Sequence, residues 1–422
     1  MDANITNEFN GLLNALLASH EAASDVLLVP GKPPQVEIHG VLESPEIGEG
    51  ILNGERVEKF ARGIINGHVK LQQDFASTGA CDCSYALVDT CRFRVNIYKQ
   101  NGQHALVMRR LSSQVPSLDS LGLPPAFKNL IAEKNGLVFV TGGAGNGKTT
   151  TLAALLNEIN LTSKVHVVTL EDPIEFLHPQ LKSTFSQREL GRDFFSFPDG
   201  LRSALRQAPK VILVGEIRDR ETMEIALTAG ETGHLVVTTL HTNSADQTIH
   251  RILGFFGKDE EHLVRERLAG SLRYIVGQRL VPKKNGGRQL VTEVMGSSLR
   301  TREAIEMGES ENRRLHEIIE AGVSGGWHSF EQSLLKAFED DLITEQTAMT
   351  YSINKPTMRQ RLDISKGHHH GQRPAKTAPA QMMVVGAAEI LPAPPVMPSM
   401  PAPIIKPEPR SSLLKGVLNG FV

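Results

Sequence analysis

A glycine-rich stretch, TGGAGNGKTT at residues 141–150, carries the spacing G-x-x-x-x-G-K-[ST]. Glycines let the backbone wrap closely around phosphates, a lysine reaches the β- and γ-phosphates, and a threonine hydroxyl can ligate Mg²⁺. The apolar run GLVFV precedes the stretch and TLAALLNEIN follows it, which predicts the strand, loop and helix that a phosphate-binding loop requires. We therefore expect a site for ATP and Mg²⁺, with Thr149 as the metal ligand. The loop residues expected to bind the nucleotide are Gly142, Gly145, Gly147, Lys148, Thr149 and Thr150.

Three further apolar segments each run into a residue that could take part in phosphoryl chemistry. VHVVTL is followed by Glu171 and Asp172, VILVG by Glu216, and HLVVTTL by His241. Ligands of open parallel sheets bind beyond the carboxyl ends of the strands, so we expect Glu171, Glu216 and His241 near the γ-phosphate. One carboxylate can polarise the attacking water, another can hold magnesium-bound waters, and the histidine can hydrogen-bond the phosphate. For any one of them alone, a solvated strand end is the alternative.

Four arginines lie outside the predicted nucleotide domain, in the stretches RFRVN and VMRRL: Arg92, Arg94, Arg109 and Arg110. One interpretation is a solvated strand face. The other is that some of them reach a nucleotide held by a neighbouring subunit and offset charge that develops during hydrolysis, as arginine fingers do.

The elements that must position these residues fall into four regions. Residues 1–113 read as a small α+β domain, with leucines at helical spacing in NGLLNALLASHEA and strict alternation in CRFRVNIYKQ. Residues 114–126 form a proline-containing linker. Residues 127–365 alternate apolar strands with helical segments, the pattern of a mainly parallel sheet covered by helices. Residues 366–422 are proline-rich and expected to be disordered, ending on SSLLKGVLNGFV, which is either a frayed end or a partner-docking peptide.

Composition narrows the classes of protein. The chain has 422 residues and a net charge of −2, which disfavours bulk nucleic-acid binding. It contains no apolar run of eighteen residues, and its acidic N-terminus does not read as a signal peptide, so a cytoplasmic location is expected. Cys81, Cys83 and Cys91 have a spacing unlike that of structural zinc sites and read instead as buried or strand-face thiols.

Together these motifs resemble the type IV pilus retraction ATPase family (PilT and PilU), within the type II/IV secretion ATPase superfamily. The resemblance rests on GGAGNGKTTTLAAL, LEDPIEF, ILVGEIRD and AGETGHLVVTTLHTNSA, supported by SQREL, GLRSALRQAP, ASDVLLVPGKPPQVEIHG and CRFRVNIYKQNG, and covers about residues 5–364. It implies a PAS-like first domain, a RecA-like ATPase domain and a homo-hexameric ring. ATP would lie between the two domains, and arginines near Arg94 and Arg109 would complete its binding site.

The resemblance also assigns roles and partners. Glu216 matches the catalytic glutamate, Glu171 and Asp172 the acidic box, and His234 and His241 the histidine box. The implied function is ATP hydrolysis that powers pilus retraction and twitching motility. The expected partners are an inner-membrane platform protein, which would hold the ring peripherally at that membrane, and a paralogous retraction ATPase, with no nucleic acid.

Three other functions stay open at this point. The first is an ATPase of a type II, type IV (DotB-like) or conjugative secretion system, because the nucleotide-site motifs are shared among these machines. The second is a nucleotide-binding regulatory ring subunit without robust hydrolysis. The third is a RecA-like DNA motor, disfavoured by the modest charge. The region LRTREAIEMGESENRRL is only loosely like the corresponding helix of the retraction ATPases.

Overall fold

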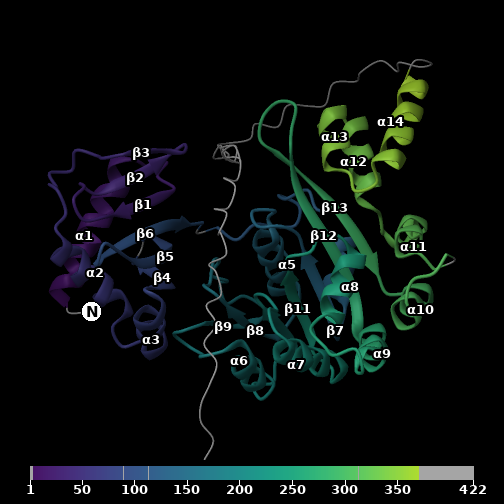
Figure 1. Cartoon of the computed structure of the whole chain (residues 1–422), viewed down its shortest axis with the longest axis horizontal. Coiled ribbons are helices and arrows are strands. Elements are labelled where there is room, and N and C mark those ends of the chain that lie inside the picture. The colour runs from purple at the N-terminus through teal and green to yellow at the C-terminus, as the bar shows by residue number, and fades with distance from the viewer. Residues whose placement is uncertain (1–2, 89, 113, 312, 370–422) are drawn as a thin grey trace, which may run out of the picture.

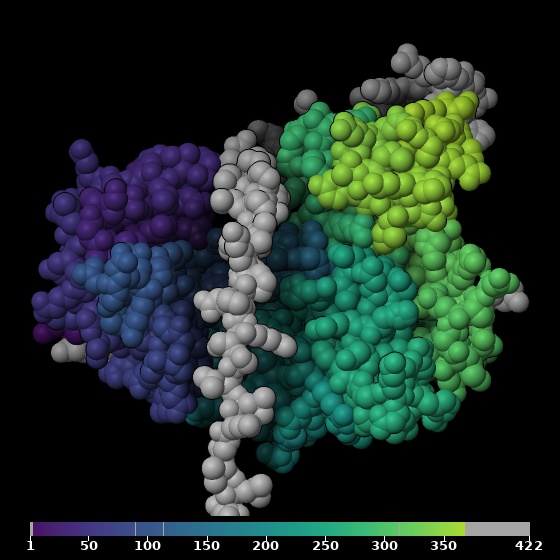
Figure 2. All heavy atoms as spheres, viewed as in Figure 1, coloured from purple at the N-terminus to yellow at the C-terminus, as the bar shows by residue number. Residues whose placement is uncertain are grey.

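The structure is a computed structural model that describes residues 3–88, 90–112, 114–311 and 313–369. The expected disordered tail and its apolar terminal segment therefore lie outside the described residues, except for residues 366–369. Figure 1 shows two sheets with their own helices, and Figure 2 shows residues of the first sheet region as a lobe beside a larger one. None of the helices in the described part combines the length and apolar character that a membrane span needs.

The first sheet is antiparallel and has the strand order β3-β2-β1-β6-β5-β4. Its strands are β1 (Asp25–Leu28), β2 (Gln35–Ile38), β3 (Val41–Glu43), β4 (Ala80–Leu87), β5 (Cys91–Gln100) and β6 (Gln103–Leu111). The helices beside it are α1 (Ala3–Ser19), α2 (Gly54–Ile65) and α3 (Val69–Thr78). This arrangement confirms the expected α+β character of the first region.

The alternation expected in the first region is present in its core. Phe93, Val95 and Ile97 of β5 are fully buried, whereas Arg92 and Arg94 point to the opposite face of the strand. β5 turns into β6 through Asn101 and Gly102, which both have positive φ, as a two-residue hairpin loop requires. The strand therefore presents its arginines on one face.

The second sheet has the strand order β13-β12-β7-β11-β10-β8-β9 and is parallel apart from the β12–β13 pair. Its strands are β7 (Gly136–Thr141), β8 (His166–Glu171), β9 (Thr184–Glu189), β10 (Val211–Val214), β11 (Leu235–Leu240), β12 (Leu272–Pro282) and β13 (Arg288–Gly296). The helices before and between these strands along the chain are α4 (Ala126–Ala132), α5 (Lys148–Thr162), α6 (Phe197–Ala204), α7 (Arg220–Glu231), α8 (Ala245–Leu253) and α9 (Glu261–Ser271). The expected mainly parallel α/β sheet is confirmed.

Both faces of this sheet are buried. Alternate strand residues such as Val138 and Val140 pack with α4 and α5, whereas Leu137 and Phe139 pack with α6 to α9. Strands covered on both faces are continuously apolar, which explains why GLVFV and VILV show no polar alternation.

A group of C-terminal helices completes the described chain: α10 (Leu299–Met307), α11 (Leu315–Ala321), α12 (Phe330–Glu339), α13 (Glu345–Tyr351) and α14 (Lys355–His369). α12 packs on β13, and α12, α13 and α14 lie at the projecting end of the β12–β13 hairpin (Figure 1). α14 runs to His369, four residues beyond the end expected for the ATPase region.

Candidate active site

The glycine-rich loop connects β7 to α5, as its motif predicts. Gly142, Gly145 and Gly147 all have positive φ. A Cβ on Gly142 would lie 2.5 Å from the Gln278 carbonyl oxygen, so that position also excludes a side chain sterically. α5 begins at Lys148, directly after the loop. The N-terminal N–H groups of this 15-residue helix therefore face the loop, which makes an anion site.

Lys148 is buried beneath this loop. Its Nζ donates to the carbonyl oxygens of Gly142 at 2.8 Å and of Gly143 at 3.1 Å. Burial lowers the pKa of the Lys148 ammonium, and the carboxylates of Glu216 and Glu175 oppose that shift. The ammonium is thus held at the loop, within the field of two carboxylates.

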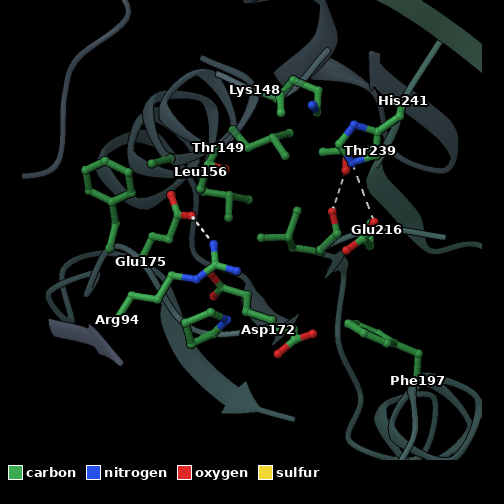
Figure 3. Close-up of a pocket in the computed structure, with 18 of the residues that line it drawn as sticks. Arg94, Lys148, Thr149, Leu156, Asp172, Glu175, Phe197, Glu216, Thr239 and His241 are labelled. Atoms are coloured by element: carbon green, nitrogen blue, oxygen red, sulfur yellow. Dashed lines mark hydrogen bonds and ion pairs between the residues drawn. The ribbon is translucent and has the colours of Figure 1, made fainter. Parts of the chain in front are cut away.

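Glu216 lies two residues beyond the end of β10 and is surrounded by groups that orient it. Its Oε2 is 3.6 Å from Nε2 of His241, and Arg218 donates to its Oε1 (Figure 3). Burial, followed by the Lys148 charge, lowers the pKa of His241, so the imidazole is neutral at pH 7. A neutral histidine beside Glu216 can donate or accept a hydrogen bond at a phosphate or an attacking water.

Glu171 ends β8 and is buried. It accepts from Thr169 Oγ1 at 2.6 Å and from Gln187 Nε2 at 3.3 Å. Burial raises the pKa of Glu171 to about 7, against the effect of these two hydrogen bonds. Burial also raises the pKa of the neighbouring Asp172, which Arg218 partly offsets.

Arg94 reaches this site from the first sheet. Its Nη1 is 4.0 Å from Oε1 of Glu175, and Figure 3 shows the guanidinium directed toward Glu175 beside Asp172. The arginine belongs to the same chain as the glycine-rich loop, so one chain brings side chains from both sheets to one cavity.

These groups line one cavity of about 320 Å³. The sequence-predicted residues that line it are Arg94, Gly145, Lys148, Thr149, Glu171, Asp172, Glu216 and His241. Thr149 supplies a hydroxyl and Glu216, Glu171 and Asp172 supply carboxylates, which is the all-oxygen donor set that Mg²⁺ prefers. The residues present therefore fit a magnesium–nucleotide complex.

Other predicted residues lie elsewhere. Gly142 and Gly147 belong to the loop, and Thr150 follows Thr149 in α5, but these three do not line the cavity itself. His234 lies just before β11, at the opposite end of that strand from His241, with Nδ1 3.2 Å from the Ala229 carbonyl oxygen. Arg109, on β6, pairs with Asp25 at 2.9 Å and leaves 71% of its side chain exposed.

Some cavity residues were not predicted. Arg218 lines the cavity and pairs with Glu216, although GEIRD already placed the two residues two positions apart. Thr239, near the end of β11, donates to the Gly215 carbonyl oxygen at 2.7 Å and so ties the residue before Glu216 to the neighbouring strand. His178 also lines the cavity, stacked on Phe185, and burial lowers its pKa to about 4.

Two other groups of potential metal ligands lie outside this cavity. Cys81, Cys83 and Cys91 are buried free thiols, and burial raises the pKa of Cys81 to about 11. Ligand atoms of His316, Glu320 and Glu331 lie within 4.8 Å of one another. Both carboxylate oxygens of Glu320, however, accept from Arg361 at 2.7 Å, and Glu331 Oε1 accepts from the backbone N–H of Asn354 at 2.8 Å. We therefore assign the second group to the packing of α11, α12 and α14.

The chain that carries this cavity is similar to known proteins. Residues 85–349 match the family described as "Type II/IV secretion system protein". The chain is 38% identical over 331 residues to the type IV pilus retraction ATPase PilT of Pseudomonas aeruginosa, covering 78% of this chain and 94% of that protein. It is 34% identical over 357 residues to the type IV pilus ATPase PilU of the same organism, covering 83% and 90%. A solved structure of the pilus retraction motor PilT with bound ADP superposes with a TM-score of 0.75 at 37% identity, covering 83% of this chain and 99% of that one.

Proposed function

The chain belongs to the type II/IV secretion system protein family, and from that membership we propose that it is a ring-forming motor ATPase whose hydrolysis of Mg²⁺-ATP drives the retraction of a type IV pilus. The observation that carries the proposal is the meeting of Lys148, Glu171, Glu216, His241 and Arg94 in one cavity at the glycine-rich loop. In phosphoryl transfer the protein contributes little covalent chemistry. Its main contribution is to position charged groups of this kind around the reacting phosphate.

The residues divide the chemistry among them. The loop N–H groups and Lys148 would bind the phosphates, and Thr149 would hold Mg²⁺, which would supply positive charge to neutralise the phosphates. Glu216 orients the attacking water and accepts its proton, while Arg218 and His241 hold the Glu216 carboxylate in place. Glu171 and Asp172 would hold waters bound to Mg²⁺. Arg94 offsets charge on the γ-phosphate from the first domain.

Motor action follows from where the cavity lies. Arg94 comes from the first sheet and the loop from the second, so a nucleotide that contacts both favours one relative orientation of the two. In a homo-hexamer, the exposed Arg109 side chain would reach a neighbouring subunit's nucleotide, and the ring would act on an inner-membrane platform protein from the cytoplasmic side, alongside a paralogous ATPase. His234, the other member of the histidine box, lies at the opposite end of β11 from His241.

A genetic experiment tests this proposal. Deleting the gene in its native bacterium should abolish pilus retraction or sharply reduce its force, measured with beads tethered to pili. Wild-type protein should restore retraction, and Glu216→Gln should not. If retraction continues unchanged while secretion of a protein or transfer of DNA stops, the chain drives a secretion or conjugation machine instead.

A further inference from the structure

Strand β9 contains most of the SQREL stretch and lies at the edge of the second sheet, next to the first domain. Its inward side chains hold the acidic loop, the segment between β8 and β9 (residues 172–183). The side-chain Nε2 of Gln187 donates to the Phe176 carbonyl oxygen at 2.8 Å, and the side-chain Oε1 of Gln187 accepts from the backbone N–H of His178 at 2.8 Å. Gln187 therefore fixes the far part of the loop that carries Asp172 and Glu175.

Glu189, two residues further along β9, joins this loop to the first domain. Its side chain is buried, with the residue 1% exposed. Oε1 accepts from Ser84 N at 3.1 Å and from Ser84 Oγ at 2.9 Å, and Oε2 accepts from Ile174 N at 3.2 Å. Ser84 belongs to β4 of the first sheet, whereas Ile174 lies in the acidic loop.

Two guanidinium groups compensate the buried Glu189 carboxylate. Arg92 Nη2 is 3.5 Å from Oε2, and Arg192 Nη1 is 3.8 Å from Oε1. Arg92 also donates to the Ile174 carbonyl oxygen at 3.0 Å and to Ser84 Oγ at 2.9 Å. A buried carboxylate with three hydrogen-bond donors and two nearby cations is strongly held. Removing the carboxylate or the guanidinium groups would leave the opposite charge buried without its partner.

The register of the first sheet connects this cluster to the nucleotide cavity. Ser84 on β4 lies directly opposite Arg94 on β5. Arg92 and Arg94 occupy alternate positions of β5 and so share one face. On the other side, Ile174 directly precedes Glu175, the partner of Arg94. The groups that Glu189 binds are therefore the immediate neighbours of both members of the Arg94–Glu175 pair.

We propose that Glu189 is a positioning residue that locks the first domain onto the acidic loop and thereby places Arg94 in the nucleotide cavity. The inference rests on the proposed ATPase function for its catalytic consequence. Its structural consequence, a fixed orientation of the two domains within one chain, stands independently. Glu189 does not line the cavity, so it acts through Arg94 and the loop.

A double-mutant cycle on the full chain tests the catalytic consequence. Glu189→Gln should lower kcat at least about tenfold and change the affinity for a fluorescent ADP analogue less than about threefold, because Lys148 and the loop remain intact. Arg94→Ala should lower kcat similarly, and the double variant should be no worse than Arg94→Ala, since coupled residues are not additive. Glu293→Gln is the matched control, because it makes the same substitution at another buried carboxyl, outside the cavity, and it should keep the wild-type kcat.

A distance measurement tests the structural consequence without activity. Spin labels at Arg62→Cys and Leu263→Cys, both exposed positions, report the separation of the two domains, and the native thiols are buried. Labelled chains are diluted with unlabelled ones so that each distance arises within one chain. Glu189→Gln should broaden the distance distribution, and Ser84→Ala, which removes one of the three donors to Glu189 and the hydroxyl that accepts from Arg92 but keeps the carboxylate, should broaden it less.

The outcomes separate the two claims. If wild-type protein hydrolyses no ATP but Glu189→Gln broadens the distances, the proposed function fails and the positioning role stands. If Glu189→Gln keeps the wild-type kcat and distance distribution, or if its loss of kcat multiplies with that of Arg94→Ala, the inference is wrong. A Glu189→Gln protein that does not fold shifts the decision to Ser84→Ala, whose unchanged distances would overturn it.

Discussion

Replacing Glu293 with glutamine should change the pH dependence of stability by an amount that the structure specifies. Glu293 lies on β13, is 3% exposed, and accepts from the Ala245 N–H at 2.8 Å. Burial raises its pKa from 4.5 to about 7, and the hydrogen bond from Ala245 opposes the shift. Its protonated form is therefore the form that the folded protein favours.

The sign follows from linkage. The folded-state pKa exceeds the unfolded-state pKa, so the stability contributed by protonated Glu293 is complete below about pH 4.5. It is lost as pH rises through about 7. A difference of about 2.5 pKa units at 1.36 kcal/mol each corresponds to about 3 kcal/mol in all, most of it between pH 5 and pH 8. Glutamine keeps an acceptor for the Ala245 N–H but does not titrate.

Thermal melting at fixed protein concentration measures the effect. The Tm of Glu293→Gln minus that of the wild type should rise by roughly 5 °C or more between pH 5 and pH 8, since about 1 kcal/mol shifts Tm by roughly 2–4 °C for a domain of about 150–250 residues, the size of the region that contains Glu293. All other groups titrate alike in the two proteins and cancel. Glu320→Gln is the control: hydrogen bonds from Ser329 and Arg361 outweigh burial and lower the pKa of Glu320, so its difference from wild type should stay flat over this range. A flat difference for Glu293→Gln as well would refute the assignment of a buried, proton-binding carboxyl.

Three further perturbations give distinct results. Lys148→Ala should weaken ADP binding at least about tenfold, because it removes a charge-assisted phosphate contact worth about 1.5–3 kcal/mol; wild-type affinity in a calorimetric titration would contradict the loop assignment. Arg109→Ala should lower kcat only under conditions in which rings assemble, because its side chain pairs with Asp25 and does not line the same chain's cavity; an equal loss of steady-state hydrolysis in dilute monomers would argue against action on a neighbour. Cys81, Cys83 and Cys91 should resist a thiol reagent at pH 8 until the protein is denatured, because burial raises the pKa of each; rapid labelling of the native protein, counted by mass spectrometry, would disagree with their burial.

Local patterns predicted a large part of the fold and of the candidate site. The glycine-rich loop was predictable because positive φ, a strand before and a helix after are all encoded in one continuous stretch, residues 136–162. The rule that parallel strands end at one edge placed Glu171, Glu216 and His241 in one cavity. The same rule could have separated His234 from His241: β11 lies between them, so roughly 20 Å of strand divides the two histidines.

Ion pairs between residues far apart in the chain could not be predicted from the sequence. Arg92, Arg94 and Arg109 look alike in an alternating strand pattern, yet Arg92 pairs with Glu189, Arg94 with Glu175 and Arg109 with Asp25. These partners are between 81 and 97 positions away in sequence. The first two pairs depend on the docking of the two sheets, and the third depends on the pairing of β6 with β1 within the first sheet. Glu189 itself follows no apolar run into a predicted site, so only the folded arrangement reveals what it holds.

The most direct test of the account is Mg²⁺-dependent ATP hydrolysis by purified protein over a range of protein concentrations, with Glu216→Gln measured beside the wild type. For a ring-forming ATPase, hydrolysis should require Mg²⁺ and rise more than proportionally with concentration as subunits assemble. Glu216→Gln should retain nucleotide binding but lose at least about 100-fold in kcat, the usual contribution of a general base. Wild-type hydrolysis by Glu216→Gln, or a wild-type protein that binds nucleotide without hydrolysing it under any of these conditions, would contradict the central claim.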